Sequence, residues 1–267
     1  MNCEICEFKN PRGTCTAVIL KDGKMLFVKR NQEPFKGVWD IPGGYMGENE
    51  VPKDTMRREL MEELGTRVNL TPIKDFFGTA SYKHYNFPIL SHVFLAELLD
   101  PIKLDEAENS EYAWIHPNDL EEVAFDSNNE IFQFVKKNFV INFEELNALI
   151  KQLDPSAEVK EQNFYKSVLN GYCSRKYVDN KLVGVGWIFP RQTYLRKQAV
   201  IEDVVVDQSQ RGKGFGEVIT LDLMRWAKEN GIDTIELTSG SHRVPANELY
   251  KKVGFQLHPT NHYLYKI

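Results

Sequence analysis

The stretch RRELMEELG, residues 57–65, contains two arginines and three glutamates, and its surroundings indicate which structure it forms. Pro52 suits the first turn of a helix and a glycine at position 65 suits a helix C-terminus, so the sequence predicts a helix over residues 52–64. The segments 14–30 and 72–99 are rich in the residues of β-strands, and the first of them contains the hairpin signal Asp22-Gly23. This region therefore reads as a helix set between strands.

The three glutamates of this helix lie on one face. Each helical residue turns by about 100°, so Glu62 and Glu63 lie within about 60° of Glu59 on either side. Like charges at this spacing repel, and a divalent cation would reverse that penalty. Carboxylate oxygens are hard ligands, which favours Mg²⁺ or Mn²⁺. Arg58 can pair with a neighbouring carboxylate and hold it in position.

A longer pattern surrounds the glutamates. Five residues separate Gly44 from Glu50, seven separate Glu50 from Arg58, and Arg58-Glu59-Leu60-x-Glu62-Glu63-x-Gly65 follows. The pattern resembles the signature of the Nudix hydrolases at every fixed position, and the resemblance extends over about residues 8–138. Thr66 departs from it, because the family usually has an aliphatic residue there. The alternative, a solvated acidic helix face, explains a run of charge but not so many spaced positions.

The resemblance implies hydrolysis of a nucleoside diphosphate linked to another moiety. By the same resemblance, Glu62 and Glu63 are metal ligands, and the Gly43 carbonyl is a further one. Glu59 is either a ligand or the base that orients water. Metal ions neutralise phosphate oxygens and lower the pKa of bound water, which is the chemistry that a pyrophosphate needs.

Substrate choice is less constrained by the sequence. Glu108 or Glu111 reaches the metal site from a downstream loop, unless both are ordinary loop charges. Tyr82 lies sixteen residues after Thr66, a spacing that resembles Nudix members acting on dinucleoside polyphosphates, where a tyrosine stacks on a base. The alternative for this residue is a tyrosine buried in a strand. ADP-ribose, NADH, a sugar nucleotide and a dinucleoside polyphosphate all stay open.

The segment VVVDQSQRGKGFGEVI, residues 204–219, runs from strand through glycine loop to helix. Glycines let the backbone approach a ligand, and the N–H groups of a helix N-terminus point at phosphate. A tight loop without a ligand is the alternative. Arg211-x-x-Gly214-x-Gly216 resembles the acyl-CoA loop of the GNAT acetyltransferases. The block SHRVPANELYKKVGF, residues 241–255, resembles a later segment of the same family.

This second resemblance covers about residues 140–267 and implies transfer of an acetyl group from acetyl-CoA to an amine. The residues that it assigns to the coenzyme pyrophosphate are Arg211, Gly212, Lys213, Gly214, Phe215 and Gly216. Tyr250 protonates the leaving thiolate, or else packs in the core. Glu202 or Asp203 accepts the proton of the amine. Strand alternation sends the two to opposite faces, so one of them lines the cleft, and we prefer Glu202.

The second resemblance leaves the ends of its fold to be assigned. We expect NFVINF, residues 138–143, to supply the first strand that the family usually has, and HYLYKI, residues 262–267, to supply the last one. The stretch NFEELNALIKQLDPS, residues 142–156, predicts a new element that begins with Asn142 as a cap.

The cysteines say less about function than these motifs do. Cys3 and Cys6 form a Cys-x₂-Cys knuckle that resembles the second half of a zinc ribbon preceding some Nudix domains. Structural zinc takes four ligands, and Cys15 lies in an apparent strand, so we do not expect zinc. Cys173 reads as ordinary packing.

Length and composition fit two ordinary domains. The chain has 267 residues and a net charge of −5, so we expect no nucleic-acid partner and no membrane partner. No apolar run is long enough to span a bilayer and the start is not a signal peptide, which favours a cytoplasmic location. We predict an α/β chain: a Nudix α/β/α sandwich with a mixed sheet over residues 1–138, then a GNAT-type mixed sheet flanked by helices over residues 139–267. The oligomeric state is open.

The function predicted from the sequence is that of a bifunctional enzyme, a pyrophosphohydrolase followed by an N-acetyltransferase. The alternative is a regulatory protein that senses a nucleotide and acetyl-CoA, and whose second half binds without turnover.

Overall fold

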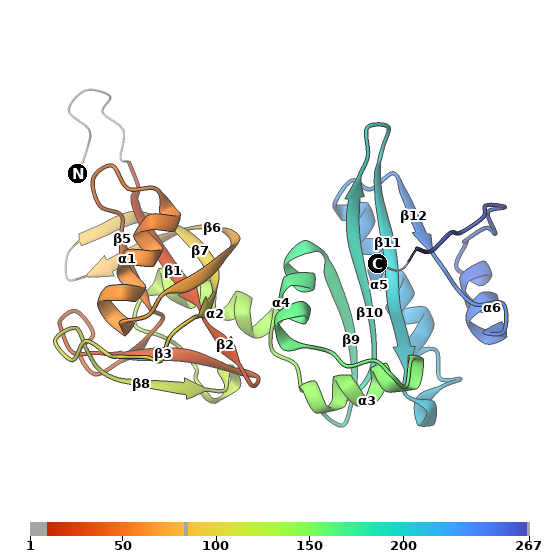
Figure 1. Ribbon diagram of the computed structural model, residues 1–267, viewed down its shortest axis with the longest axis horizontal. Helices are drawn as coiled ribbons and strands as arrows, with labels where there is room; N and C mark the ends of the chain where they lie inside the picture. Colours follow the sequence, from red (N-terminus) through yellow and green to blue (C-terminus); the bar gives the residue numbers. More distant parts are fainter. Residues whose placement is uncertain (1–9, 83–84, 266–267) are drawn as a thin grey trace. The chain divides into compact units, whose positions relative to one another are not determined.

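The computed structural model describes residues 10–82 and 85–265, which form two compact units (Figure 1). The boundary along the chain lies between Ile141 and Asn142. Asn142 caps the first helix of the second unit, as the sequence predicts, because its side chain accepts a hydrogen bond from the Glu145 N–H at 3.1 Å. Over the described residues, each helix is too short or too polar to cross a bilayer. Cys3 and Cys6 lie outside the described residues.

The first unit is built on two sheets. Its elements are β1 (Arg12–Val18), β2 (Leu20–Lys21), β3 (Lys24–Arg30), β4 (Trp39–Asp40), β5 (Gly43–Tyr45), α1 (Pro52–Leu64), β6 (Val68–Tyr82), β7 (Tyr85–Leu98), β8 (Asn109–Ile115), η1 (Pro117–Asp119) and α2 (Asp126–Asn138). The order β5-β1-β7-β6 makes a mixed sheet in which β1 runs parallel to β7, and β3 joins β2, β4 and β8 in the other. The hairpin turn between β2 and β3 forms at Asp22 and Gly23, both with positive φ, as predicted.

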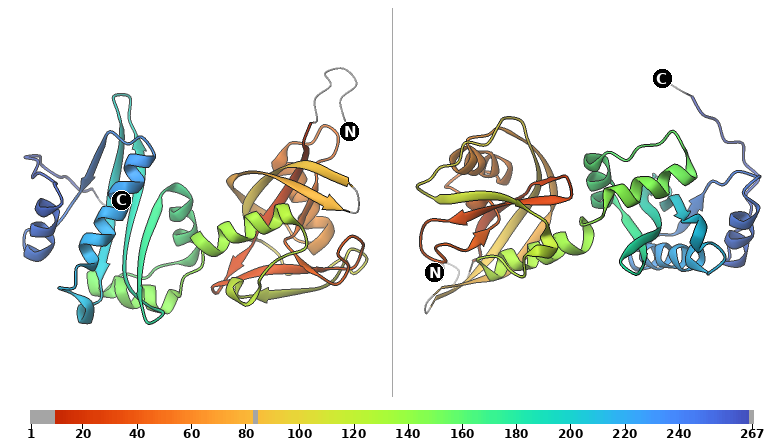
Figure 2. Two further views of the ribbon diagram at one scale, coloured as in Figure 1. Left: turned by 180° about the vertical axis from the view of Figure 1, so that it is seen from behind. Right: turned by 90° about the horizontal axis from the view of Figure 1, so that it is seen from below.

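Helix α1 has the predicted bounds, and its apolar side enters the core. Pro52 begins the helix and Gly65 ends it in the left-handed conformation, with φ of 60°. Met56, Leu60 and Leu64 are fully buried against β1, β3 and β7. Helix α2 packs elsewhere, on β6 and β7, so that the strands lie between the two helices (Figure 2, right). The predicted α/β class and mixed sheet are confirmed.

The second unit has one sheet with helices on both faces. Its elements are α3 (Phe143–Leu153), α4 (Glu161–Asn170), β9 (Tyr172–Val178), β10 (Lys181–Gln192), β11 (Lys197–Val206), η2 (Gln208–Gln210), α5 (Phe215–Glu229), β12 (Thr234–Leu237) and α6 (Val244–Lys252). The strand order is β12-β11-β10-β9, with β11 parallel to β12 and the other pairs antiparallel. Ile219 and Leu223 of α5 pack on one face, against Ile188 and Ile201. Helices α3 and α4 pack on β9, β10 and β11 (Figure 2).

Two predicted strands of the second unit are wrong. Residues 138–143 are the end of α2, a short connection and the start of α3, because Asn142 caps a helix instead of entering a sheet. Residues 262–265, the described part of HYLYKI, have no regular structure, and Tyr263, Leu264 and Tyr265 are exposed. Both segments have an apolar pattern typical of strands, but neither pairs with a strand of the described sheet.

Candidate active sites

Arg58 organises the acidic face of α1. Its guanidinium donates to Glu50 at 2.7 and 2.9 Å, and its Nη1 donates to Glu59 and to Glu62 at 2.8 Å each. The hydrogen bonds from Arg58 to Glu50, and then the one from the Gly47 N–H, lower the pKa of Glu50 to about 2. The prediction that Arg58 pairs with a neighbouring carboxylate is confirmed, and the structure extends it to three.

Glu63 lies on the same face but is held differently. Its carboxylate accepts the Gly43 N–H at 3.0 Å and lies 3.4 Å from the Asn109 amide. Burial, and then the nearby negative charge of Glu59, raise the pKa of Glu63 to about 8. Among the described residues, no cationic side chain forms an ion pair with it. A buried carboxylate of this kind is stabilised by an added cation.

The backbone before α1 approaches the carboxylates closely. A Cβ at Gly44 would overlap the Glu59 carboxylate, so a side chain at this position would displace that carboxylate. Burial raises the pKa of Glu59, the Arg58 hydrogen bond opposes it, and Glu62 and Glu108 add smaller upward contributions. Glu59 is thus in electrostatic contact with three other carboxylates, those of Glu62, Glu63 and Glu108. As they stand, Glu59 and Glu62 turn to Arg58, and no three acidic, histidine or cysteine side chains of residues 10–82 and 85–265 are gathered as a metal site.

The structure places only some of the predicted substrate residues beside the site. Glu108 lies close enough to raise the pKa of Glu59, which places it beside the site. Glu111 instead pairs with Lys29 at 3.3 Å, with more than half of its side chain exposed. The backbone of Tyr82 pairs opposite Tyr85 at the end of β6, and its side chain lies outside the described part of the chain.

The glycine loop of the second unit lies between β11 and α5. Gly212 and Gly214 have φ of 77° and 85°, and a Cβ at either would meet nothing within 4 Å, so backbone conformation alone selects glycine here. The first helical bond is from Val218 N–H to the Gly214 carbonyl. Among the described residues, no acceptor takes the N–H groups of residues 212–216. These donors are therefore available to an anionic ligand at the start of a fifteen-residue helix.

The two basic side chains of this loop form hydrogen bonds with nearby residues of the same loop region. Arg211 donates to the Val206 carbonyl at 3.1 Å, and Lys213 donates to Gln210 at 2.8 Å. Both remain exposed and keep a positive charge beside the free N–H groups. The loop is therefore electropositive through its backbone and its side chains together.

Tyr250 and Glu202 lie within electrostatic reach of each other. Burial raises the pKa of Tyr250, Arg243 opposes this, and Glu202 adds to it. The Tyr250 ring makes an edge contact with Phe255 at 6.0 Å between centroids. A raised pKa keeps the hydroxyl protonated, which is the state that a general acid needs.

The predicted alternation of Glu202 and Asp203 is wrong, because β11 has a bulge there. Two residues of β11, Asp203 and Val204, lie opposite the single residue Gly186 of β10, and Asp203 has φ of 54°. Ile201 and Val204 both pack toward α5. The two residues between them therefore face the α4 side together, and Glu202 pairs directly opposite Trp187 on that side.

Comparison with known proteins supports both halves. A family model described as NUDIX domain matches residues 9–137, and one described as Acetyltransferase (GNAT) family matches residues 140–255. The uncharacterized N-acetyltransferase YvbK of Bacillus subtilis is 31% identical over 120 residues, which cover 45% of this chain and 72% of that protein. The nucleoside triphosphatase NudI of Escherichia coli K12 is 31% identical over 122 residues, which cover 42% of this chain and 84% of that protein.

The chain is a Nudix hydrolase joined to a GNAT acetyltransferase. Another relative of the Nudix half is the ADP-ribose pyrophosphatase of Methanocaldococcus jannaschii, 28% identical over 133 residues, which cover 48% of this chain and 76% of that protein.

The departure of Thr66 from the Nudix pattern has a local explanation. Thr66 is fully buried, and its hydroxyl donates toward the carbonyls of Arg67 and Asp100 at 3.0 and 3.1 Å. The Asp100 N–H points back at the same oxygen at 3.3 Å. The hydroxyl is therefore satisfied where an aliphatic side chain would pack.

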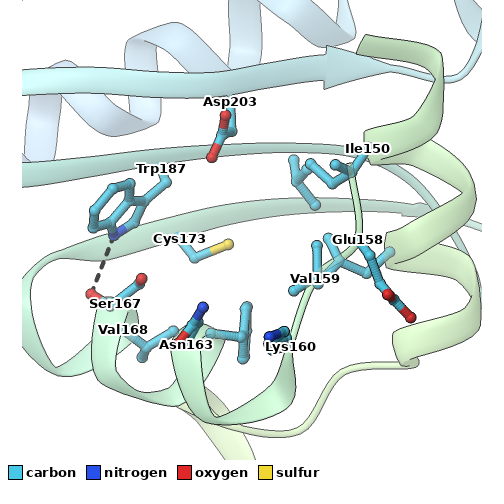
Figure 3. Close-up of a pocket in the computed structure, with 14 residues that line it drawn as sticks. Ile150, Glu158, Val159, Lys160, Asn163, Ser167, Val168, Cys173, Trp187 and Asp203 are labelled. Atoms are coloured by element: carbon cyan, nitrogen blue, oxygen red, sulfur yellow. Dashed lines mark hydrogen bonds between the residues drawn. The ribbon is translucent and has the colours of Figure 1, made fainter. Parts of the chain in front are cut away.

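Sequence reasoning missed Asn109 and the position of Cys173. Asn109 is buried at the start of β8 and supplies the side-chain donor to Glu63 of the Nudix unit. Cys173 lines a pocket of the GNAT unit together with Asp203 and Trp187 (Figure 3). No local pattern signals either role, since both depend on strand register.

Proposed function

We propose that the Nudix unit hydrolyses a nucleoside diphosphate linked to another moiety, with a divalent metal ion. The observation that carries this proposal is Glu63, a buried carboxylate beside Glu59 that lacks a cationic partner among the described residues. The donor set fits Mg²⁺ or Mn²⁺, because Glu59, Glu62 and Glu63 supply hard oxygens from one helix face and the Gly43 backbone lies against Glu63. When bound, such an ion neutralises phosphate oxygens and acidifies water.

The residues of the chain divide the remaining work. Glu62 and Glu63 would hold the ion, and Glu59 would either take the proton of the attacking water or join the ligands and leave that proton to solvent. That water adds to phosphorus, one bridging phosphorus–oxygen bond breaks, and the second phosphate group leaves. Arg58 competes for Glu59 and Glu62, and keeps these charges balanced before the ion binds. Glu108 is the downstream carboxylate that we place beside this site.

The names of the relatives suggest where to begin with substrates. One curated relative is an ADP-ribose pyrophosphatase and another is a nucleoside triphosphatase. Purified protein should therefore be incubated with ADP-ribose, NADH, diadenosine polyphosphates and nucleoside triphosphates plus Mg²⁺, and the products separated by chromatography. We expect turnover of at least one diphosphate-linked compound that is abolished by EDTA. Binding without turnover across the set would instead favour nucleotide sensing.

We further propose that the GNAT unit transfers an acetyl group from acetyl-CoA to an amine. The unpaired N–H groups of residues 212–216 support this, with Arg211 and Lys213 adding positive charge toward the coenzyme pyrophosphate. The amine nitrogen bonds to the acetyl carbon and passes one proton to Glu202. The carbon–sulfur bond breaks, and Tyr250 gives one proton to the sulfur.

Two measurements test the second proposal in sequence. Calorimetry with acetyl-CoA tests the loop, and we expect one binding event per chain. A thiol-release assay with a panel of amines then tests transfer. Absence of acetyl-CoA binding would contradict the role of the loop, and binding with no acetylated amine would favour a sensor.

A further inference from the structure

The GNAT unit has a pocket on the face of its sheet that α3 and α4 cover (Figure 3). Its volume is about 220 Å³, below the range of about 300–1,000 Å³ that holds drug-sized ligands. Ile150, Val159 and Val168 give it apolar walls, and Asp203 points into it from the bulge of β11. The pocket therefore suits a small molecule with an apolar body.

Asp203 is the negative side chain that points into the pocket. The pocket residues that can carry charge are Glu158, Lys160, Cys173 and Asp203. Glu158 and Lys160 are exposed at the rim and their charges offset each other, while burial raises the pKa of the Cys173 thiol and keeps it neutral. No described residue forms a hydrogen bond or an ion pair with the Asp203 carboxylate.

Asp203 is exposed to solvent although it lines the pocket. Desolvation by the surrounding protein raises the pKa of its carboxyl, so the ionised form is less favourable in the folded chain than in the unfolded one. The contribution of Asp203 to stability therefore falls as pH rises through its titration. The bulge places this carboxylate on the pocket side of the sheet, where it is exposed, so a ligand in the pocket can replace water as its partner.

An indole ring stands beside this carboxylate. Trp187 donates from Nε1 to the Ser167 carbonyl of α4 at 3.1 Å, and its ring stacks on Phe189 at 4.5 Å between centroids. These two contacts hold the ring in place at the pocket wall. A fixed indole next to a carboxylate is a suitable environment for an ammonium group, which gains from both.

We propose that this pocket takes the acetyl acceptor, and that the acceptor is a small amine whose single ammonium group faces Asp203 and Trp187. The inference rests on the proposed acetyl transfer, and it adds the class of the acceptor. Its apolar body lies among Ile150, Val159 and Val168. Glu202 lies next to Asp203 on the same side of the strand, outside the pocket lining. The bound ammonium would first lose one proton to water, and its neutral nitrogen would then attack the acetyl carbon and pass a second proton to Glu202. Asp203 is then the residue that selects amines over neutral molecules of the same shape.

Calorimetry without acetyl-CoA tests the pocket directly. The probes are butylamine and 2-phenylethylamine, with 1-butanol and 2-phenylethanol as neutral counterparts of the same shape. We expect at least one amine to bind, and its alcohol to bind at least about 10-fold more weakly. Asp203→Asn should weaken amine binding by about 10- to 100-fold, the usual value of a hydrogen bond to a charged group, and leave alcohol binding unchanged.

Controls separate this result from damage to the fold. Glu229→Gln removes the same charge at the exposed end of α5 and should leave amine binding unchanged. The melting temperature of Asp203→Asn should be no lower than that of the wild type, because an unfavourable charge is removed. In turnover, Asp203→Asn should raise the KM for the amine and leave the KM for acetyl-CoA unchanged.

The outcomes distinguish the pocket from the reaction. Equal amine affinity in wild type and Asp203→Asn, equal affinity for amine and alcohol, or no binding of either amine would overturn the proposed pocket. If acetyl-CoA binds and amines are acetylated in that case, the proposed transfer stands without it. Amine binding that depends on Asp203 in a protein that does not bind acetyl-CoA would retain an amine pocket and remove its assignment to an acetyl acceptor.

Discussion

The acidic helix face of the Nudix unit and the glycine loop of the GNAT unit are prepared in opposite ways. On α1, Arg58 already engages Glu50, Glu59 and Glu62, so much of the charge is balanced within the chain. In the loop before α5, the N–H groups of residues 212–216 have no acceptor among the described residues. A ligand of the first site must compete with an internal cation, whereas a ligand of the second meets donors that are already unoccupied.

The largest expected effect is on the rate of hydrolysis, and it concerns Glu63, the buried carboxylate of the acidic helix face. Glu63→Gln keeps the shape of the side chain and removes a charge that we assign to the metal. Since metal catalysis supplies several kcal/mol, hydrolysis should fall by at least about 10³-fold at saturating Mg²⁺. Glu111→Gln, which loses only a surface pair with Lys29, should keep wild-type turnover. Near wild-type rates for Glu63→Gln would remove this residue from the chemistry.

The next effect concerns the transfer step beside the loop. Tyr250→Phe keeps the ring and its contact with Phe255 but loses the hydroxyl. The rate of acetyl transfer should fall by about 10²–10⁴-fold, the usual range for general acid catalysis, with acetyl-CoA affinity nearly intact. A thiol-release assay and calorimetry measure the two quantities. An unchanged transfer rate would mean that another group protonates the thiolate.

The backbone conformation of the glycine loop can be changed without removing any of its N–H donors. Gly214→Val places a β-branched residue at φ of 85°, which strains the backbone that carries the N–H groups. We expect acetyl-CoA affinity to fall by about 10-fold or more in calorimetry. Gly231→Val introduces comparable strain at φ of 63° beyond the other end of α5 and serves as the matched control. Equal affinity losses in both variants would indicate general damage to the helix.

The smallest effect concerns stability at the acidic face. Glu62→Gln removes a half-exposed ion pair with Arg58 and also a repulsion with Glu59, so the two changes oppose each other. The free energy of unfolding of metal-free protein should change by less than about 0.5 kcal/mol in urea titrations. A loss above about 2 kcal/mol would show that Glu62 is part of the fold, and would weaken its assignment as a ligand.

The sequence predicted what local spacing controls. The bounds of α1, the hairpin at Asp22 and the cap at Asn142 follow from residues close in the chain, and all three are confirmed. Strand pairing is different, because the apolar pattern of residues 138–143 suits a strand and says nothing about a partner. The sites divide in the same way: the pairing of Arg58 was predictable, while Asn109 reaches Glu63 through long-range packing.

The bulge in β11 makes the length of that strand as important as its composition. Ile201 and Val204 both face α5 because the two residues between them share the other side. Deleting either of these two would restore simple alternation, with one residue between Ile201 and Val204, and would leave residues 204–206 on the faces that they now have. The core valines would therefore keep their places. The loss would fall on the pocket, because the bulge is what places Asp203 on the pocket side of the sheet. We therefore expect a one-residue deletion here to change the pocket more than the core.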